Sequence, residues 1–186
     1  MALFGRKRAL QRALESDWTG EEDHDALVAE LREARVSARD AMSLLCNADA
    51  GIRQVGVEAY LRSPSRGDVR DLVLHLAEQR AHVRAFGARV LGKVDTDVVS
   101  RGIDDLLGHR AVPVRRLAWD VAVSLPGSLG VAYVRRALEE APSSLRVVAV
   151  QRLGQRNDPS TVLDVLLIAA RDSDDAVADA AQEHLL

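Results

Sequence analysis

The sequence predicts an all-α fold, a right-handed α-solenoid of about five two-helix repeats with a capping helix before them. Three observations predict it. A short motif recurs at a fixed interval, apolar residues recur with helical spacing around it, and signals for β-strands are absent. The 186 residues contain neither a sustained alternation of apolar and polar residues nor an Asn-Gly hairpin turn.

The recurring motif is an apolar residue followed by arginine, with a small residue three positions after the arginine. Successive arginines of the motif are 31 residues apart: Arg53, Arg84, Arg115 and Arg146. A fifth copy at residues 177–181 follows after 32 residues and lacks the arginine. Three equal intervals within one coherent pattern indicate repeated structural units.

Residues around each arginine are spaced for a helix that buries one face. The positions one before and two, three and seven after the arginine share one side of a helix. The residue three positions after it is small in every copy: Gly56, Gly87, Ala118, Ala149 and Ala181. Because glycine costs a helix about 1 kcal/mol relative to alanine, its recurrence predicts that a neighbouring helix approaches closely. Leu91, seven residues after Arg84, is expected in the core.

A second apolar stripe precedes the motif in each copy, so each unit is expected to be a helix, a turn and a second helix. One such pair cannot bury its apolar stripe alone, and the pairs are therefore expected to stack. The predicted repeats cover residues 37–63, 67–94, 95–126, 127–156 and 157–186. A capping helix is expected over residues 21–36, with Leu27, Val28 and Leu31 inward. Residues 1–20 are expected to be a separate segment, either a short helix or a flexible lead-in.

The pattern Val-Arg-x-x-Ala/Gly continues with Leu-Gly seven and eight residues after the arginine, at Leu91-Gly92 and Leu153-Gly154. It resembles the short HEAT-like repeats of the phycobilisome-lyase type over about residues 38–186. The resemblance implies an armadillo-like helical solenoid that serves as a protein-binding scaffold. The last copy keeps the acidic turn Asp174-Asp175 and departs from the pattern by losing the arginine.

Composition favours a soluble, cytoplasmic protein without catalytic machinery. Charged residues make up 28 % and the net charge is −3. The single cysteine, Cys46, cannot form an internal disulfide, and no apolar run approaches the roughly 20 residues that span a bilayer. Phosphate-binding loops, nucleophile elbows and His/Cys spacings for a metal are all absent from the sequence. We therefore expect no catalytic residues, no cofactor and no metal.

Stacking would place the four motif arginines in a row at the start of the second helices. One interpretation is a strip that binds acidic ligands or phosphate. The preferred interpretation is structural: each arginine pairs with an acidic residue or with turn carbonyls at the repeat junction, as the HEAT resemblance implies. Asp49, four residues before Arg53, suits such a role.

The exposed, concave face of the second helices is the predicted contact surface for a partner. Its residues are Gln54, Glu58, Arg89, Arg116, Asp120 and Gln151. Residues 53–156 carry 17 basic and 11 acidic side chains between acidic flanks, a balance that could also attract nucleic acid. Because this face mixes both signs of charge, a protein partner is preferred, and a nucleic-acid-binding solenoid is the alternative.

Two smaller features carry weaker hypotheses. Trp119 and Asp120 invite comparison with HEAT-like DNA glycosylases of the alkylation-repair type, which use aromatic and acidic residues on the concave face. Only these two adjacent residues match, so packing at a repeat junction is the preferred role of Trp119. Residues 1–14 combine apolar residues with four basic ones. A basic amphipathic helix that touches an anionic membrane or enters a partner groove is therefore the alternative to a solvated lead-in.

Overall fold

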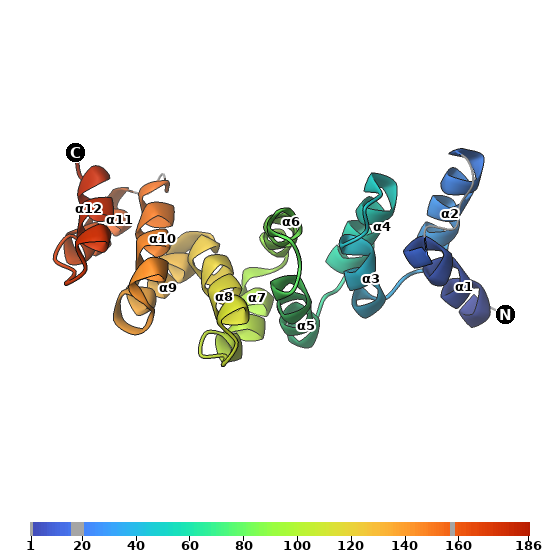
Figure 1. Cartoon of the computed structure of the whole chain (residues 1–186), viewed down its shortest axis with the longest axis horizontal. Helices are drawn as coiled ribbons and strands as arrows, with labels where there is room; N and C mark the ends of the chain where they lie inside the picture. Colours follow the sequence, from blue (N-terminus) through green and yellow to red (C-terminus); the bar gives the residue numbers. More distant parts are fainter. Residues whose placement is uncertain (1, 16–20, 157–158) are drawn as a thin grey trace. The chain divides into compact units, whose positions relative to one another are not determined.

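The computed structural model describes residues 2–15, 21–156 and 159–186, without the side chains of residues 2–6, 21–22 and 159–161. Every element in these ranges is an α-helix except one 3₁₀ turn (Figure 1), which confirms the predicted all-α class. None of the helices in these ranges combines the length and the apolar character that crossing a membrane requires.

Contacts divide the chain into two compact units, an N-terminal unit of residues 1–102 and a C-terminal unit of residues 103–186. The N-terminal unit holds α1 (Ala2–Glu15), α2 (Glu21–Glu33), α3 (Ala38–Leu45), α4 (Ala50–Leu61), α5 (Arg66–Ala77), α6 (Ala81–Leu91) and nearly all of α7 (Thr96–Ile103). The C-terminal unit holds η1 (Asp104–Leu106), α8 (Val112–Ser124), α9 (Gly127–Glu140), α10 (Ser143–Gly154), α11 (Pro159–Ala169) and α12 (Asp175–Glu183). Each of the five predicted repeat windows thus contains two helices, with α5 beginning one residue before its window.

In the N-terminal unit α1 to α4 pack on one another, and α5 joins them through α3. Helix α3 packs on α4 and also contacts α1 and α5, while α2 contacts α1 and α4. Helix α2 lies within the residues predicted for the capping helix, and α1 corresponds to the short helix that is one alternative for residues 1–20; the two helices contact each other. Ala9 and Ala13 are fully buried on α1, so small residues let this helix pack closely although it lacks the repeat motif.

In the C-terminal unit α10 lies between α8 and α12, and α9 contacts α8, α10 and α11 (Figure 1). Helices α8, α10 and α12 therefore form one layer and α9 and α11 the other. Successive second helices are neighbours in this layer, so their exposed faces are continuous with one another.

The small residue of the motif has the packing role that its recurrence predicts. A Cβ atom at the buried Gly56 would lie 2.8 Å from the backbone nitrogen of Leu45, and one at Gly87 would overlap the side chain of Leu76. The second helix of each of these pairs therefore touches the first helix where glycine occurs. Leu91 is fully buried, as expected.

Helix α6 buries a narrower face than its spacing predicts. Val83 and Phe86 occupy motif positions expected in the core, but both are only half-buried. The guanidinium carbon of Arg89 lies 6.0 Å from the centre of the Phe86 ring and covers part of it. The buried side of α6 is instead centred on Gly87, Val90 and Leu91.

Local polar signals determine where several helices begin. Helices α3, α4, α5 and α12 follow N-cap residues whose side-chain oxygens accept a first-turn N–H, namely Ser37, Asp49, Ser65 and Asp174. Proline marks two others, since α8 has Pro113 in its first turn and α10 begins after Pro142. The missing N–H of proline costs little at these positions.

A histidine links α2 to the N-cap of α4. Nε2 of His24 lies 2.9 Å from Oδ1 of Asp49, and its Nδ1 lies 3.3 Å from Oδ1 of Asp25. The hydrogen bond with Asp49 is the main reason that the pKa of His24 is raised, and partial desolvation opposes it. The same bond, followed by the N–H of Ile52, lowers the pKa of Asp49. The folded protein therefore favours the charged form of both groups.

This link is expected to make stability depend on pH. The stability contributed by His24 is complete below the ordinary histidine pKa and is lost as pH rises through its raised pKa. The stability contributed by Asp49 is complete above the ordinary aspartate pKa and is lost as pH falls through its lowered pKa. The difference in free energy of unfolding between the wild type and His24→Gln should therefore be largest between about pH 4 and pH 6.5. Urea denaturation at pH 5, 7 and 9 measures it. A difference that stays constant over this range contradicts the expectation.

Candidate partner surface

Each motif arginine donates to a carbonyl of the turn that precedes its own helix. The pairs are Arg53 with Asn47 and Ala48, Arg84 with Gln79, Arg115 with His109, and Arg146 with Ala141, over N···O distances of 2.5 to 3.1 Å. All four arginines are half-buried. Their guanidiniums thus tie the turn to the second helix of the same pair. This geometry supports the structural interpretation of the motif over a strip for phosphate.

The sequence suggests Asp49 as the acidic partner of Arg53, but the structure gives both residues other partners. Asp49 accepts from the N–H of Ile52 and pairs with His24, and Arg53 uses carbonyl acceptors instead. Arg146 does have a carboxylate partner, Asp172, which lies in the turn between α11 and α12. Nε and Nη2 of Arg146 donate to the two carboxylate oxygens over 2.9 and 2.8 Å. This bidentate pair therefore joins one predicted repeat to the next.

Residues of the predicted contact surface are accessible to solvent. Gln54, Arg89, Arg116 and Gln151 are exposed, and Glu58 and Asp120 are half-buried. Four of the six residues are thus fully exposed, and exposure alone does not identify a binding site. Gln54 and Glu58 lie together on α4 and Arg89 lies on α6, all in the N-terminal unit; the other three lie in the C-terminal unit.

Two arginines beside this surface are absent from the sequence prediction. Arg32 of α2 donates to both carboxylate oxygens of Glu58, over 3.3 and 3.4 Å. Arg152 of α10 lies 3.5 Å from Asp120 of α8. Partners are 26 residues apart in the first pair and 32 in the second, so only a search for opposite charges over a range of separations near the repeat length would have found both. Such exposed pairs contribute about 0–1 kcal/mol, which leaves these side chains free to pair again with a bound protein.

The tryptophan that invites the glycosylase comparison is in the core. Trp119 is 3 % exposed, and the guanidinium carbon of Arg136 lies 6.0 Å from the centre of its ring. A base cannot stack on a ring that is covered in this way. The geometry therefore supports a packing role for Trp119, while Asp120 lies at the surface beside Arg152. Among the described residues no group of three His, Cys, Asp or Glu could hold a metal ion.

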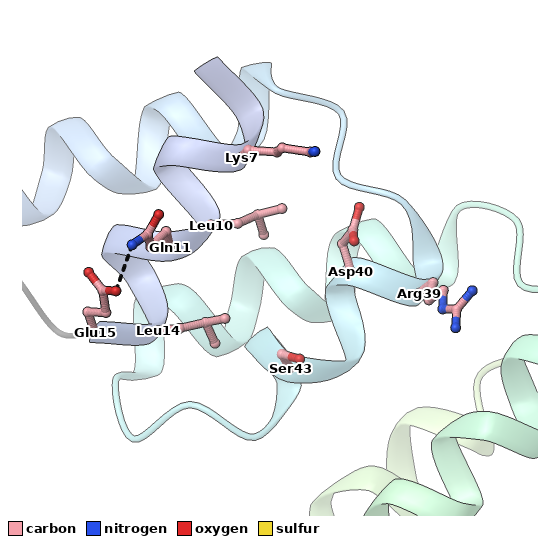
Figure 2. A pocket seen from close by; sticks show the side chains of 8 residues that line it. All are labelled: Lys7, Leu10, Gln11, Leu14, Glu15, Arg39, Asp40 and Ser43. Atoms are coloured by element: carbon pink, nitrogen blue, oxygen red, sulfur yellow. Dashed lines mark hydrogen bonds between the residues drawn. The ribbon is translucent and has the colours of Figure 1, made fainter. Parts of the chain in front are cut away.

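Helix α1 forms one wall of a groove. Figure 2 shows the groove between α1 and α3, with Leu10 and Leu14 of α1 pointing toward α3. Its volume is about 520 Å³, and it is lined by Lys7, Leu10, Gln11, Leu14, Glu15, Arg39, Asp40 and Ser43. The described part of α1 is packed through Ala9 and Ala13. It is thus packed in the N-terminal unit, with Leu10 and Leu14 on its groove side and Arg8 exposed outside the groove.

Comparison with models of known protein families finds none that matches this sequence, and comparison with curated proteins finds no match either. Function is therefore inferred from the chemistry of the described surfaces. Those surfaces are the mixed-charge faces of the second helices, the groove between α1 and α3, and the outer side of α11.

Proposed function

We propose that the chain is a HEAT-like α-solenoid that acts as a non-catalytic protein-interaction scaffold in the cytoplasm. The repeat motif and the two helical layers of the C-terminal unit support the solenoid. Arginines that tie each turn to its own second helix support the short-repeat arrangement.

The observation that carries the proposal is the continuous surface of α8 and α10. These helices are neighbours, and Arg116, Asp120 and Gln151 lie on their solvent side, with Arg152 bridging to Asp120. Positive, negative and neutral polar groups alternate there. Such a surface complements a protein that carries its own mixture of charges. A duplex nucleic acid would favour more uniformly basic side chains, because its affinity comes largely from phosphate contacts.

Reversing one charge on this surface, at Arg116, and one on the exposed side of α6, at Arg89, tests the proposal. The double variant Arg89→Glu/Arg116→Glu is expected to keep its fold, because both side chains are exposed. Capture of a protein partner whose acidic groups contact these arginines should fall by about tenfold or more. The measurement is a quantitative pull-down from lysate of the native host with and without nuclease, together with a thermal melt of each variant.

The matched control is Arg70→Glu/Arg110→Glu, which makes the same change in net charge at exposed arginines on α5 and in the turn before α8. An equal loss of binding in this control would mean that bulk charge, and not the proposed surface, attracts the partner. Loss of all bound material on nuclease treatment would instead favour the nucleic-acid solenoid, whose binding should also weaken steeply with added salt.

A further inference from the structure

Helix α11 exposes an apolar ridge. Leu163, Leu167 and Ile168 are 49 %, 46 % and 52 % exposed, and they account for half of the large hydrophobic residues that are exposed in the described part of the chain. The opposite side of α11 buries Val165 and Leu166 against its neighbours. Leaving three large apolar side chains in water on one short helix is unfavourable unless something covers them.

Two opposite charges flank the apolar ridge, one on α11 and one in the turn directly after it. Asp164 falls between Leu163 and Leu167, and Arg171 follows in the turn that ends the helix. Both side chains are exposed, and neither forms an ion pair within the described residues. The charges are seven residues apart, about two helical turns, with the apolar pair Leu167-Ile168 midway between them.

Along this face the order of charged and apolar residues matches the same face of a second copy that runs in the opposite direction. A two-fold axis passing between Leu167 and Ile168 sets Asp164 of one copy opposite Arg171 of a second copy. The same axis sets Leu167 opposite Ile168 of the second copy. Contacts in which residue i meets j and j meets i are those of an isologous dimer. We propose that this face of α11 binds the same face of a second copy of the chain, in an antiparallel helix pair.

A recess beside the ridge offers space for the second copy. A groove of about 250 Å³ runs between α9 and α11, lined by Arg135, Leu138, Glu139, Ile168, Ala169, Arg171 and Asp172. Ile168 belongs to both the ridge and the groove. Leu167 of the second copy, which lies opposite Ile168, is therefore placed at the edge of this groove, where Leu138 supplies apolar surface.

A second copy fits better than a partner of one charge sign. A uniformly basic ligand would meet Arg171 and a uniformly acidic one would meet Asp164, so each would leave one like-charge contact. Because a single helix face covers less than the roughly 800 Å² per partner of a standard interface, the dimer is expected to be weak. The proposal is independent of the surface on the second helices, and the two can fail separately.

Sedimentation velocity of the full chain from about 5 μM to 1 mM tests the association, which should show a shift from monomer toward dimer as concentration rises. Leu167→Glu should remain monomeric over this range with an unchanged thermal midpoint, because the side chain is nearly half exposed. The control Val112→Glu, at an apolar residue of α8 that is still more exposed than Leu167, should dimerise like the wild type. A wild type that is monomeric at all concentrations overturns the proposal.

A charge exchange tests the register. Asp164→Arg and Arg171→Asp should each weaken dimerisation by about tenfold or more, because each variant sets like charges opposite one another. The double variant restores two opposite-charge pairs and should recover the wild-type dissociation constant within about threefold. Exposed side chains at both positions keep this test valid even if Leu167→Glu fails to fold. Dimers that respond to neither single variant overturn the α11 interface.

Discussion

Replacing Leu91 with Asp is expected to lower the free energy of unfolding by about 3–5 kcal/mol. Leu91 is fully buried on α6, on the side where this helix packs on α5. A carboxylate there would lose its water without gaining a partner, or would have to take up a proton. Urea denaturation of the full chain measures the loss.

Leu14→Asp on α1 is the matched control, because the same change at a half-exposed leucine should cost less than about 1 kcal/mol. Equal stability of Leu91→Asp and the wild type would contradict the inward face assigned to α6. In a stack with nearest-neighbour contacts, the damage from Leu91→Asp should also spread to the adjoining helices. Hydrogen exchange would then show faster opening of α5 together with α6.

Asp172→Ala is expected to destabilise the protein by about 2–4 kcal/mol, because it leaves the guanidinium of Arg146 without its carboxylate. These side chains are only 18 % and 10 % exposed, so water replaces the lost partner poorly. A double-mutant cycle with Arg146→Ala isolates the interaction, and the combined variant should cost less than the sum of the two. Additive losses would mean that the pair is not coupled.

The control for this pair is Glu140→Ala. Glu140 pairs with Arg136, but both side chains are more than 40 % exposed, so its loss should cost less than about 1 kcal/mol. The Arg146 hydrogen bond is also the main reason that the pKa of Asp172 is lowered. The stability that the Arg146–Asp172 pair adds is therefore complete above the ordinary aspartate pKa of about 3.9. It is lost as pH falls through the lowered pKa of Asp172. The difference between the wild type and Asp172→Ala should shrink below about pH 4.

Sequence alone predicts the helical pairs well, because their signals are local. Spacing places Leu91 in the core and Gly56 at a close helix contact, since both follow from the period of one helix. Spacing also predicts the exposure of Arg89 and Arg116. It does not show which of these residues share a compact unit, because that depends on contacts between helices distant in the sequence.

Other features have no local signal. Helix α1 pairs with α2 through Ala9 and Ala13, which carry no motif. The partner of Arg146 lies 26 residues away, and finding it requires knowing which turns are neighbours. The ridge on α11 is hidden for another reason: this helix is apolar on most sides, so periodicity does not separate its inward Leu166 from its outward Leu167.

The arginine bonds to turn carbonyls have a consequence for how such a chain can change in length. Donor and acceptor lie only five or six residues apart in four successive copies, so each bond is carried entirely within one sequence unit. Duplicating or deleting a whole 31-residue unit would carry every such bond along intact. The bond from Arg146 to Asp172 behaves differently, because removing residues 157–186 would leave that arginine without its carboxylate. Removing the last pair of helices would therefore also remove a side-chain bond from the pair before it.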